Sequence, residues 1–480
     1  MSPILRALAM ALAIAAASPA AAKEPLQKRV EALLSEAPRG TRFGLVVATE
    51  EGRELVAIAP EHRFMPASTT KIFTTAAAFA TLPDLSGPDT SGGAAVRLRL
   101  DRRGAPDVII EGRGDARLSS APGCIVNCLA ALADAVAART RTVDDVIGDG
   151  RRFPDERWSP GMSWNNIAHW HGTGISALTL DDNELPMRVV PTSPGKPPRL
   201  EHHSYYMVEN RAVTVAAGET ELEFDRLPGS KLGRLSGTIL AGAEPKLQRL
   251  GIDDPAHYAA WRLKALLQQR GVRIKGEVKA LHRPPLPEEN ANSAGDDASE
   301  EMLARITPPP LAEDILRINK ESQNLHAELL LRRVGSVAGD GSIEDGTAAV
   351  AAMLERAGVP RTSFDFSDGS GMSTYNRVAP RGVVMLLRWI ARQPWGGAWR
   401  ASLPVAGIDG TLAKRFRGTA LRGRLFAKTG TLNATNALAG YMIAASGRTL
   451  TFSIHANDVP QDGGATGLMD RALLLIAAEN

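Results

Sequence analysis

Hydrophobic positions near the start of the chain predict a helix, a hairpin and a second helix. Apolar residues at helical spacing predict an amphipathic helix over residues 24–36. Two short apolar runs, Gly44–Ala48 and Glu54–Ile58, predict a pair of strands joined by a turn at residues 50–53. An unbroken apolar segment then predicts a helix over residues 67–82.

The C-terminal part contains the same kinds of element in a different order. Helical patterns dominate from about residue 300 to Arg424, and strand-like runs follow at Leu425–Lys428, Leu438–Ile443 and Leu450–Ile454. A final apolar helix covers Met469–Ala478. Because strands and helices occur at both ends, we expect a multidomain α/β protein whose main sheet is built from distant halves of the chain.

The middle of the chain has a different character. Residues 84–93 are rich in Pro, Gly and Ser, and residues 284–300 are Pro-rich and then acidic, as is typical of linkers. Short strand and helix patterns alternate between them. We therefore predict a discontinuous domain made of residues 23–88 and 300–480, an inserted region over residues 89–299, and a linker over residues 284–300.

The first 22 residues are not expected to belong to the fold. A positive start at Arg6 precedes the apolar run Ala7–Ala17, and Ala20–Ala22 supplies the small residues that a signal peptidase accepts. A membrane anchor is the alternative, but 11 apolar residues are too few, since a bilayer needs about 20. We predict a cleaved signal peptide over residues 1–22, a periplasmic protein and no transmembrane anchor.

Composition narrows the class of protein. Of the 480 residues, 44% are hydrophobic and 23% are charged, which is ordinary for globular domains. The 56 Lys and Arg nearly balance the 53 Asp and Glu, so we expect no nucleic-acid partner. The two cysteines, Cys124 and Cys128, either form a local disulfide outside the cytoplasm or are small buried side chains on one helix face. Nothing in the pattern indicates an oligomeric state.

Motifs for several common chemistries are missing from the sequence. It has no G-x-S-x-G nucleophile elbow, no P-loop and no H-E-x-x-H metal motif. Gly112–Gly114 follows a strand candidate, but Arg117 stands where a dinucleotide-binding loop requires its third glycine. Two close histidine pairs, near residues 170 and 202, lack carboxylates or cysteines at ligand spacing. We therefore expect neither a metal nor a cofactor.

Three short motifs, in order along the chain, carry the positive signal. Ser68–Lys71 is S-x-x-K, Ser322–Asn324 is S-x-N and Lys428–Gly430 is K-T-G, a set that resembles that of penicillin-binding proteins and class A β-lactamases. A second S-x-x-K at Ser193–Lys196 shows that single copies arise by chance, but Pro and Gly keep it out of a regular helix. The first motif, by contrast, opens an apolar helix, and the third lies on a strand.

Ser68 and Lys71 have the spacing of a nucleophile and its base. Three residues apart on a helix, they share one face, and the helix start offers free N–H groups to a developing negative charge. Lysine is a base only when neutral, so its usual pKa of about 10.4 must fall to about 7. Burial and a second cation, for which Lys428 is the candidate, lower the pKa of an amine.

The other motif residues are candidates for proton transfer and substrate binding. Ser322 can relay a proton to the leaving amine, and Asn324 can hold Lys71 and a substrate amide. Any one of these side chains alone is better explained as an ordinary helix cap or surface group, and only the ordered triplet favours a catalytic site. We expect a substrate carboxylate and backbone to be bound by Lys428, Thr429, Gly430 and Thr431.

Longer segments accompany the triplet: Gly112–Asp115, Ile318–Glu328, Asp368–Ser373, Ala406–Leu412 and Ala427–Leu432. With the triplet, they resemble the D-alanyl-D-alanine carboxypeptidases of the class C, low-molecular-mass penicillin-binding type, the penicillin-binding protein 4 type. The resemblance covers nearly all of residues 24–480.

The resemblance implies a split transpeptidase-like domain, with an antiparallel sheet flanked by helices, and an insertion of two small domains, one nested in the other. It implies that the penultimate D-alanine of a peptidoglycan stem peptide acylates Ser68, that terminal D-alanine leaves, and that water releases the acyl-enzyme. Endopeptidase activity on cross-links and covalent inhibition by β-lactams are also implied. The oxyanion hole would be the backbone N–H groups of Ser68 and Thr431.

Two positions depart from the family's pattern. Thr374 stands where members often carry an arginine, and Asn166 stands where a carboxylate is usual, so we predict weaker recognition of a diaminopimelyl end. Two other functions use the same motifs, a β-lactamase or esterase on the same fold and a non-catalytic peptidoglycan-binding protein. The intact triplet and the lack of a class A type E-x-x-L-N segment favour the carboxypeptidase.

Overall fold

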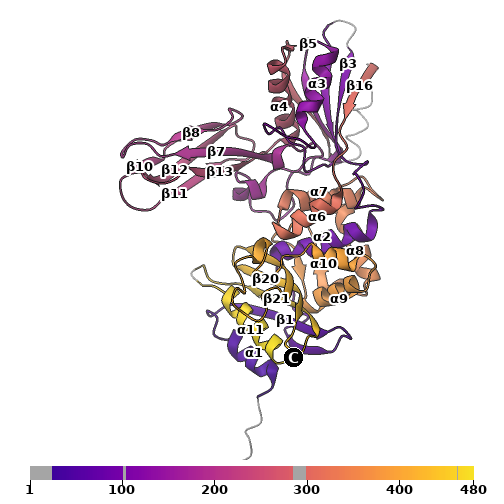
Figure 1. Ribbon diagram of the computed structural model, residues 1–480, viewed down its shortest axis with the longest axis vertical. Coiled ribbons are helices and arrows are strands. Elements are labelled where there is room, and N and C mark those ends of the chain that lie inside the picture. The colour runs from indigo at the N-terminus through magenta and orange to yellow at the C-terminus, as the bar shows by residue number, and fades with distance from the viewer. Residues whose placement is uncertain (1–23, 101–103, 285–298, 462) are drawn as a thin grey trace, which may run out of the picture.

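The computed structural model describes residues 24–100, 104–284, 299–461 and 463–480. The predicted signal peptide and residues 285–298 of the predicted linker lie outside the described residues. Figure 1 shows an elongated molecule, with a lower part in indigo, orange and yellow, an upper part in purple and red, and a magenta arm to one side.

A five-stranded antiparallel sheet joins the two ends of the described chain. Its strand order is β19-β20-β21-β1-β2, so the N-terminal hairpin pairs with the C-terminal strands. The expectation of an α/β protein with a sheet built from distant halves of the chain is therefore confirmed. The strands are β1 (Arg42–Thr49), β2 (Glu54–Ile58), β19 (Leu425–Leu432), β20 (Thr435–Ile443) and β21 (Thr449–Asn457).

Helices cover both faces of this sheet, so nearly all residues of β1, β20 and β21 are buried. On one face, α1 (Leu26–Leu34) and α11 (Thr466–Ala478) pack together against side chains such as Leu45 and Ile454. The helices of the second core are α2 (Lys71–Thr81), α6 (Leu311–Lys320), α7 (Asn324–Gly335), α8 (Ile343–Arg356), α9 (Pro380–Ala391) and α10 (Gly396–Ala401). In this core they bury apolar side chains together with Ala439 and Tyr441 of β20.

The chain between α2 and α6 builds a second, mixed sheet with the order β15-β6-β4-β3-β16. Its strands are β3 (Ala94–Leu100), β4 (Asp107–Gly112), β6 (Val146–Pro154), β15 (Val278–Arg283) and β16 (Ser299–Arg305), and α3 (Leu129–Arg139) and α4 (Pro255–Gln269) pack against it. β16 pairs with β3, so the residues just after 298 form a strand of the inserted region. β16 is held by pairing with β3, which is distant in the sequence. The linker-like composition before β16 therefore gave no indication of this strand. The other domain limits stay predictions.

The magenta arm of Figure 1 consists of two small sheets. One has the order β13-β7-β8, and the other contains β9, β10, β11 and β12. Their bounds are β7 (Glu184–Val190), β8 (Arg199–Glu201), β9 (Met207–Asn210), β10 (Val213–Val215), β11 (Glu221–Arg226), β12 (Leu232–Leu240) and β13 (Lys246–Gly251). The remaining short strands are β5 (Thr142–Val143), β14 (Arg273–Ile274), β17 (Phe364–Asp365) and β18 (Arg377–Val378).

Cys124 and Cys128 are joined by a disulfide directly before α3, so of the two alternatives the structure contains the bonded pair. None of the helices in the described ranges is long and apolar enough to cross a membrane. Those ranges also contain no group of three or more His, Cys, Asp or Glu side chains placed to hold a metal ion.

Candidate active site

The three sequence motifs meet at one place. Ser68 lies in a short 3₁₀ helix, η1 (Ala67–Thr70), which leads into α2 at Lys71. The sequence predicted one regular helix through both residues. A 3₁₀ turn instead places side chains three residues apart directly above one another. The Nζ atom of Lys71 lies 3.0 Å from the Oγ atom of Ser68.

Lys71 is the centre of the hydrogen-bond network. Its Nζ atom donates to Oδ1 of Asn324 at 2.7 Å and to the carbonyl oxygen of Ser370 at 2.6 Å. The side chain is fully buried, and burial lowers its pKa to about 7, whereas the carboxylates of Asp368 and Glu328 act in the opposite direction. A large fraction of the amine is therefore neutral at pH 7 and able to accept the proton of the Ser68 hydroxyl.

Lys428 is a second buried amine beside the first. Its Nζ atom donates to Oγ of Ser322 at 2.9 Å and to the carbonyl oxygen of Thr429 at 3.0 Å. Burial lowers the pKa of Lys428 well below its usual value, and the charge of Lys71 lowers it further. Of the two causes expected from the sequence, burial and a second cation, burial is the one that lowers the pKa of Lys71, because the whole side chain is packed away from water. The charge of Lys428 is not among the causes at Lys71.

Gly430 lies directly against the turn that carries Ser68. A Cβ atom at this position would be 2.5 Å from the carbonyl oxygen of Pro66, which is closer than real Cβ contacts allow. The glycine therefore lets β19 approach this turn, and its predicted contact with a substrate backbone stays a prediction.

Ala67, directly before Ser68, and Ser322 have backbone conformations in the left-handed region, with φ of 47° and 63°. Non-glycine residues adopt it at a cost of about 1–3 kcal/mol, which the surrounding structure must offset.

The substrate-facing candidates lie on the outer side of the buried amines. Thr431 is exposed on β19, the edge strand of the sheet, and Thr429 is partly exposed and donates from Oγ1 to Oγ1 of Thr411 at 2.7 Å. Ser68 and Ser322 are also partly exposed. The arrangement presents hydroxyls at the surface, with two amines of lowered pKa directly beneath them.

Sequence reasoning missed the role of Asp368, which shapes the loop behind Lys71. Its carboxylate accepts hydrogen bonds from the backbone N–H of Gly371 at 2.9 Å and of Ser373 at 2.6 Å. A local signal was present, since an aspartate followed by Gly and Ser is typical of a turn in which the side chain binds backbone N–H groups. Thr374, at the end of this loop, donates from N and Oγ1 to the carbonyl oxygen of Gly161 in the inserted region.

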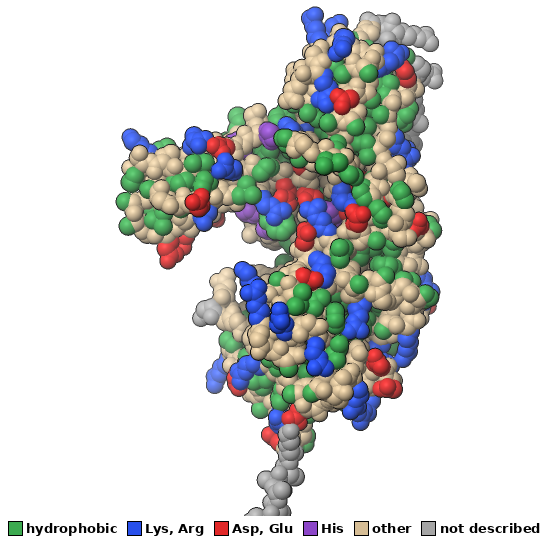
Figure 2. All heavy atoms as spheres, viewed as in Figure 1, with side chains coloured by type: hydrophobic (Ala, Val, Ile, Leu, Met, Phe, Trp, Pro, Cys, Tyr) green, Lys and Arg blue, Asp and Glu red, His purple; other side chains and the backbone are tan. Residues whose placement is uncertain are grey.

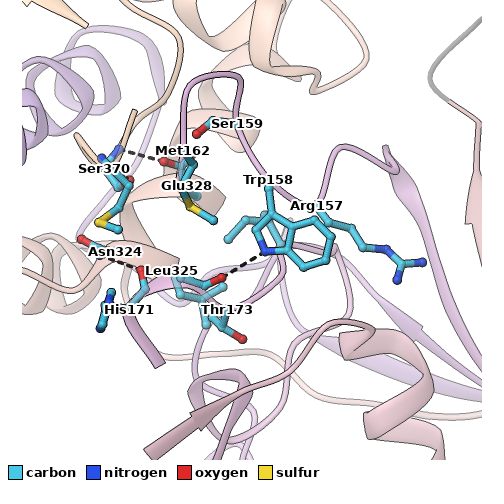
Figure 3. A pocket seen from close by; sticks show the side chains of 13 residues that line it. Arg157, Trp158, Ser159, Met162, His171, Thr173, Asn324, Leu325, Glu328 and Ser370 are labelled. Atoms are coloured by element: carbon cyan, nitrogen blue, oxygen red, sulfur yellow. Dashed lines mark hydrogen bonds between the residues drawn. The ribbon is translucent and has the colours of Figure 1, made fainter. Parts of the chain in front are cut away.

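The inserted region contacts the catalytic network directly. The Nδ2 atom of Asn324 donates to the carbonyl oxygen of His171 at 2.9 Å, and Trp158 Nε1 donates to the carbonyl oxygen of Gly172 at 3.0 Å. Figure 3 shows Trp158, His171 and Thr173 of the insertion beside Asn324 of α7. The short segment around His171 thus fixes the amide that holds Lys71. Asn166, the other departure from the family's pattern, contacts the ring of His171 at 3.3 Å.

A buried histidine joins the insertion to α7. The ring of His326 contacts Asp314 of α6 at 3.0 Å and Asp182 of the insertion at 2.9 Å, and Arg317 also donates to Asp182 at 2.6 Å. Burial lowers the pKa of His326, but hydrogen bonds and charge from the two carboxylates outweigh it and raise the pKa above 6.5. The ring therefore ties three elements together.

This contact predicts a pH-dependent contribution to stability. Because the folded pKa of His326 is raised, its stabilising effect is fully present below pH 6.5 and is lost as the pH rises through the folded pKa. We expect His326→Gln to reduce the free energy of unfolding by about 1–3 kcal/mol at pH 6 and by less at pH 9. Urea unfolding at the two pH values measures this, with the exposed His62→Gln as control. An equal loss at both pH values would contradict the prediction.

Comparison with known proteins identifies the family. The model of the D-Ala-D-Ala carboxypeptidase 3 (S13) family matches residues 26–475. The chain belongs to this family. The D-alanyl-D-alanine carboxypeptidase of Actinomadura sp. (strain R39) is 34% identical over 481 residues, covering 93% of this chain and 85% of that protein. The D-alanyl-D-alanine carboxypeptidase DacB of Haemophilus influenzae is 25% identical, with coverage of 88% and 87%.

The fold is shared with a solved structure. Penicillin binding protein 4 (dacB) from Haemophilus influenzae matches with a TM-score of 0.77 at 22% identity, over 92% of this chain and 98% of that one. The family resemblance and the fold class expected from the sequence are both confirmed.

Proposed function

We propose that the protein is a periplasmic serine DD-carboxypeptidase that also cleaves peptidoglycan cross-links as a DD-endopeptidase and is inhibited by β-lactams. The observation that carries the proposal is the buried Lys71 amine, 3.0 Å from Oγ of Ser68 and with a pKa of about 7. It provides what a serine nucleophile needs, a base that is neutral near neutral pH.

In the proposed acylation, Oγ of Ser68 attacks the carbonyl carbon of the penultimate D-alanine while Lys71 Nζ accepts the hydroxyl proton. The backbone N–H groups of Ser68, in the first turn of its helix, and of Thr431, on the edge strand, bind the oxyanion. Lys428, Thr429 and Thr431 bind the terminal carboxylate through charge and hydroxyl donors. These roles rest on the positions of the side chains around Lys71 and along β19.

As the C–N bond breaks, the proton that Lys71 accepted passes through the hydroxyl of Ser322 to the leaving nitrogen of the terminal D-alanine, and Lys71 is neutral again. The Ser322 hydroxyl also accepts a hydrogen bond from Lys428. Water then attacks the Ser68 ester while Lys71 takes its proton and returns it to Oγ of Ser68, which releases the shortened peptide. A cross-linked stem peptide presents the same D-alanyl carbonyl, with another amine as leaving group, so the same steps perform the endopeptidase reaction.

The relatives support the substrate class. The Actinomadura and Haemophilus proteins are named D-alanyl-D-alanine carboxypeptidases, and the Haemophilus penicillin binding protein 4 has been solved in complex with a novel β-lactam, with a TM-score of 0.72 to this chain. The predicted signal peptide supports a periplasmic location. The stem peptides of peptidoglycan are therefore the proposed substrates, and β-lactams the proposed covalent inhibitors.

The test is digestion of purified peptidoglycan peptides, with product analysis by mass. Uncross-linked pentapeptides are expected to lose one D-alanine, cross-linked dimers to become monomers, and the Ser68→Ala variant to do neither. Binding of the peptides without any release of D-alanine would contradict the proposal and favour a non-catalytic binding protein. Cephalosporin turnover faster than about 1 per second would instead favour a β-lactamase.

A further inference from the structure

Glu328 lies one helical turn after Asn324 on α7 and is only 6% exposed. Its Oε1 atom accepts hydrogen bonds from the backbone N–H of Gly369 at 3.1 Å and of Ser370 at 2.9 Å. The carbonyl oxygen of Ser370 in turn accepts from Nζ of Lys71 at 2.6 Å. Figure 3 shows Glu328, Ser370 and Asn324 around one small cavity. Glu328 is thus connected to the proposed base through a single backbone turn.

The second oxygen of this carboxylate has no such contact. Oε2 of Glu328 is buried and has no hydrogen-bond partner among the described residues, and the same is true of Nη1 of Arg332, four residues further along α7. Glu328 lines a cavity of about 20 Å³, together with Asn324 and Ser370, which is enough space for one water molecule. A buried, half-satisfied carboxylate destabilises a fold, so stability alone does not account for an ionisable group at this position.

Three charged groups surround this carboxylate and the proposed base. Asp368 faces Glu328 and Lys71 from the loop, Arg332 faces Glu328 from its own helix, and Lys428 approaches Lys71 from β19. Burial, with the charge of Asp368 added, raises the pKa of Glu328 above its usual range.

We propose that Glu328 is a positioning residue for Lys71, an inference that rests on the serine–lysine function proposed above. It holds the Gly369–Ser370 turn so that the Ser370 carbonyl directs the Lys71 amine toward Oγ of Ser68. Its negative charge, like that of Asp368, favours the ammonium form of Lys71 and opposes the effect of burial. The carboxylate thereby sets the pH at which Lys71 becomes a base.

The variant Glu328→Gln separates charge from shape. Glutamine keeps an oxygen that can accept from both N–H groups, but it carries no charge. Without that charge the pKa of Lys71 falls, so the acid limb of the acylation rate is expected to move to lower pH by about one unit. Stopped-flow acylation by a fluorescent penicillin between pH 5 and 9 measures the shift, and the melting temperature reports whether the fold is kept.

Two further variants make the result specific. Glu328→Asp keeps the charge but shortens the side chain, so the rate is expected to fall while the midpoint of the acid limb stays. Glu184→Gln makes the same change at a buried glutamate of the insertion, which is not among the charges acting on Lys71. Both the acylation rate and the midpoint of its acid limb are expected to stay unchanged in this variant. An unshifted midpoint in Glu328→Gln, or a uniform loss of rate with a lower melting temperature, would overturn the inference.

The same experiment distinguishes this inference from the proposed function. If the unsubstituted protein is not labelled at Ser68, as mapped by mass spectrometry, the serine–lysine function itself is wrong and the role of Glu328 falls with it. If labelling at Ser68 is normal but the midpoint does not respond to Glu328→Gln, only the role of Glu328 is wrong.

Discussion

Replacing Ser68 with alanine is expected to abolish covalent labelling by a fluorescent penicillin, with a loss of at least about 10³-fold in the acylation rate. The reason is that the attacking oxygen is removed while the buried lysines stay in place. Gel fluorescence after a timed incubation measures the labelled fraction, and circular dichroism checks that the variant is folded.

The chain supplies a matched control for this variant. Ser193 starts the second S-x-x-K of the sequence, in an exposed loop between β7 and β8. Because no buried network surrounds it, Ser193→Ala is expected to be labelled like the unsubstituted protein. Equal labelling of Ser68→Ala and Ser193→Ala would show that the nucleophile has been assigned to the wrong residue.

Replacing Lys71 with alanine is expected to slow acylation by about 10³-fold, within the range that a general base contributes. In the unsubstituted protein, the acylation rate is expected to fall as the pH drops below about 7, because Lys71 then takes up a proton and can no longer accept one from Ser68. Stopped-flow labelling across pH 5–9 measures both effects.

The control for this second prediction is Lys196→Ala, which removes the exposed lysine of the same chance motif. Its rate and pH profile are expected to match those of the unsubstituted protein. An acylation rate independent of pH between 5 and 9 would contradict the assignment of Lys71 as the base, even if Lys71→Ala were inactive through loss of structure.

The elements around the main sheet were predictable because burial gives them a strong pattern. β1, β20 and β21 are covered by helices on both faces and are therefore rich in apolar and small residues, and α1 shows one apolar stripe. The short strands of the arm, such as β8 with three residues, have no such pattern, because their stability comes from pairing with neighbours. For the same reason β16 was not foreseen after the linker-like segment.

The sequence by itself determined which chemical groups the candidate site contains: two serines, two lysines and an asparagine. It also indicated a helix start at Ser68 and a strand at Lys428. Only the tertiary structure decided what those groups do to one another. Burial lowers the pKa of Lys71 to about 7. Backbone carbonyl groups orient the amine, that of Ser370 directly and that of His171 through the side chain of Asn324. Desolvation and the positions of backbone atoms depend on how distant segments pack, so neither can be predicted from the identity of a residue.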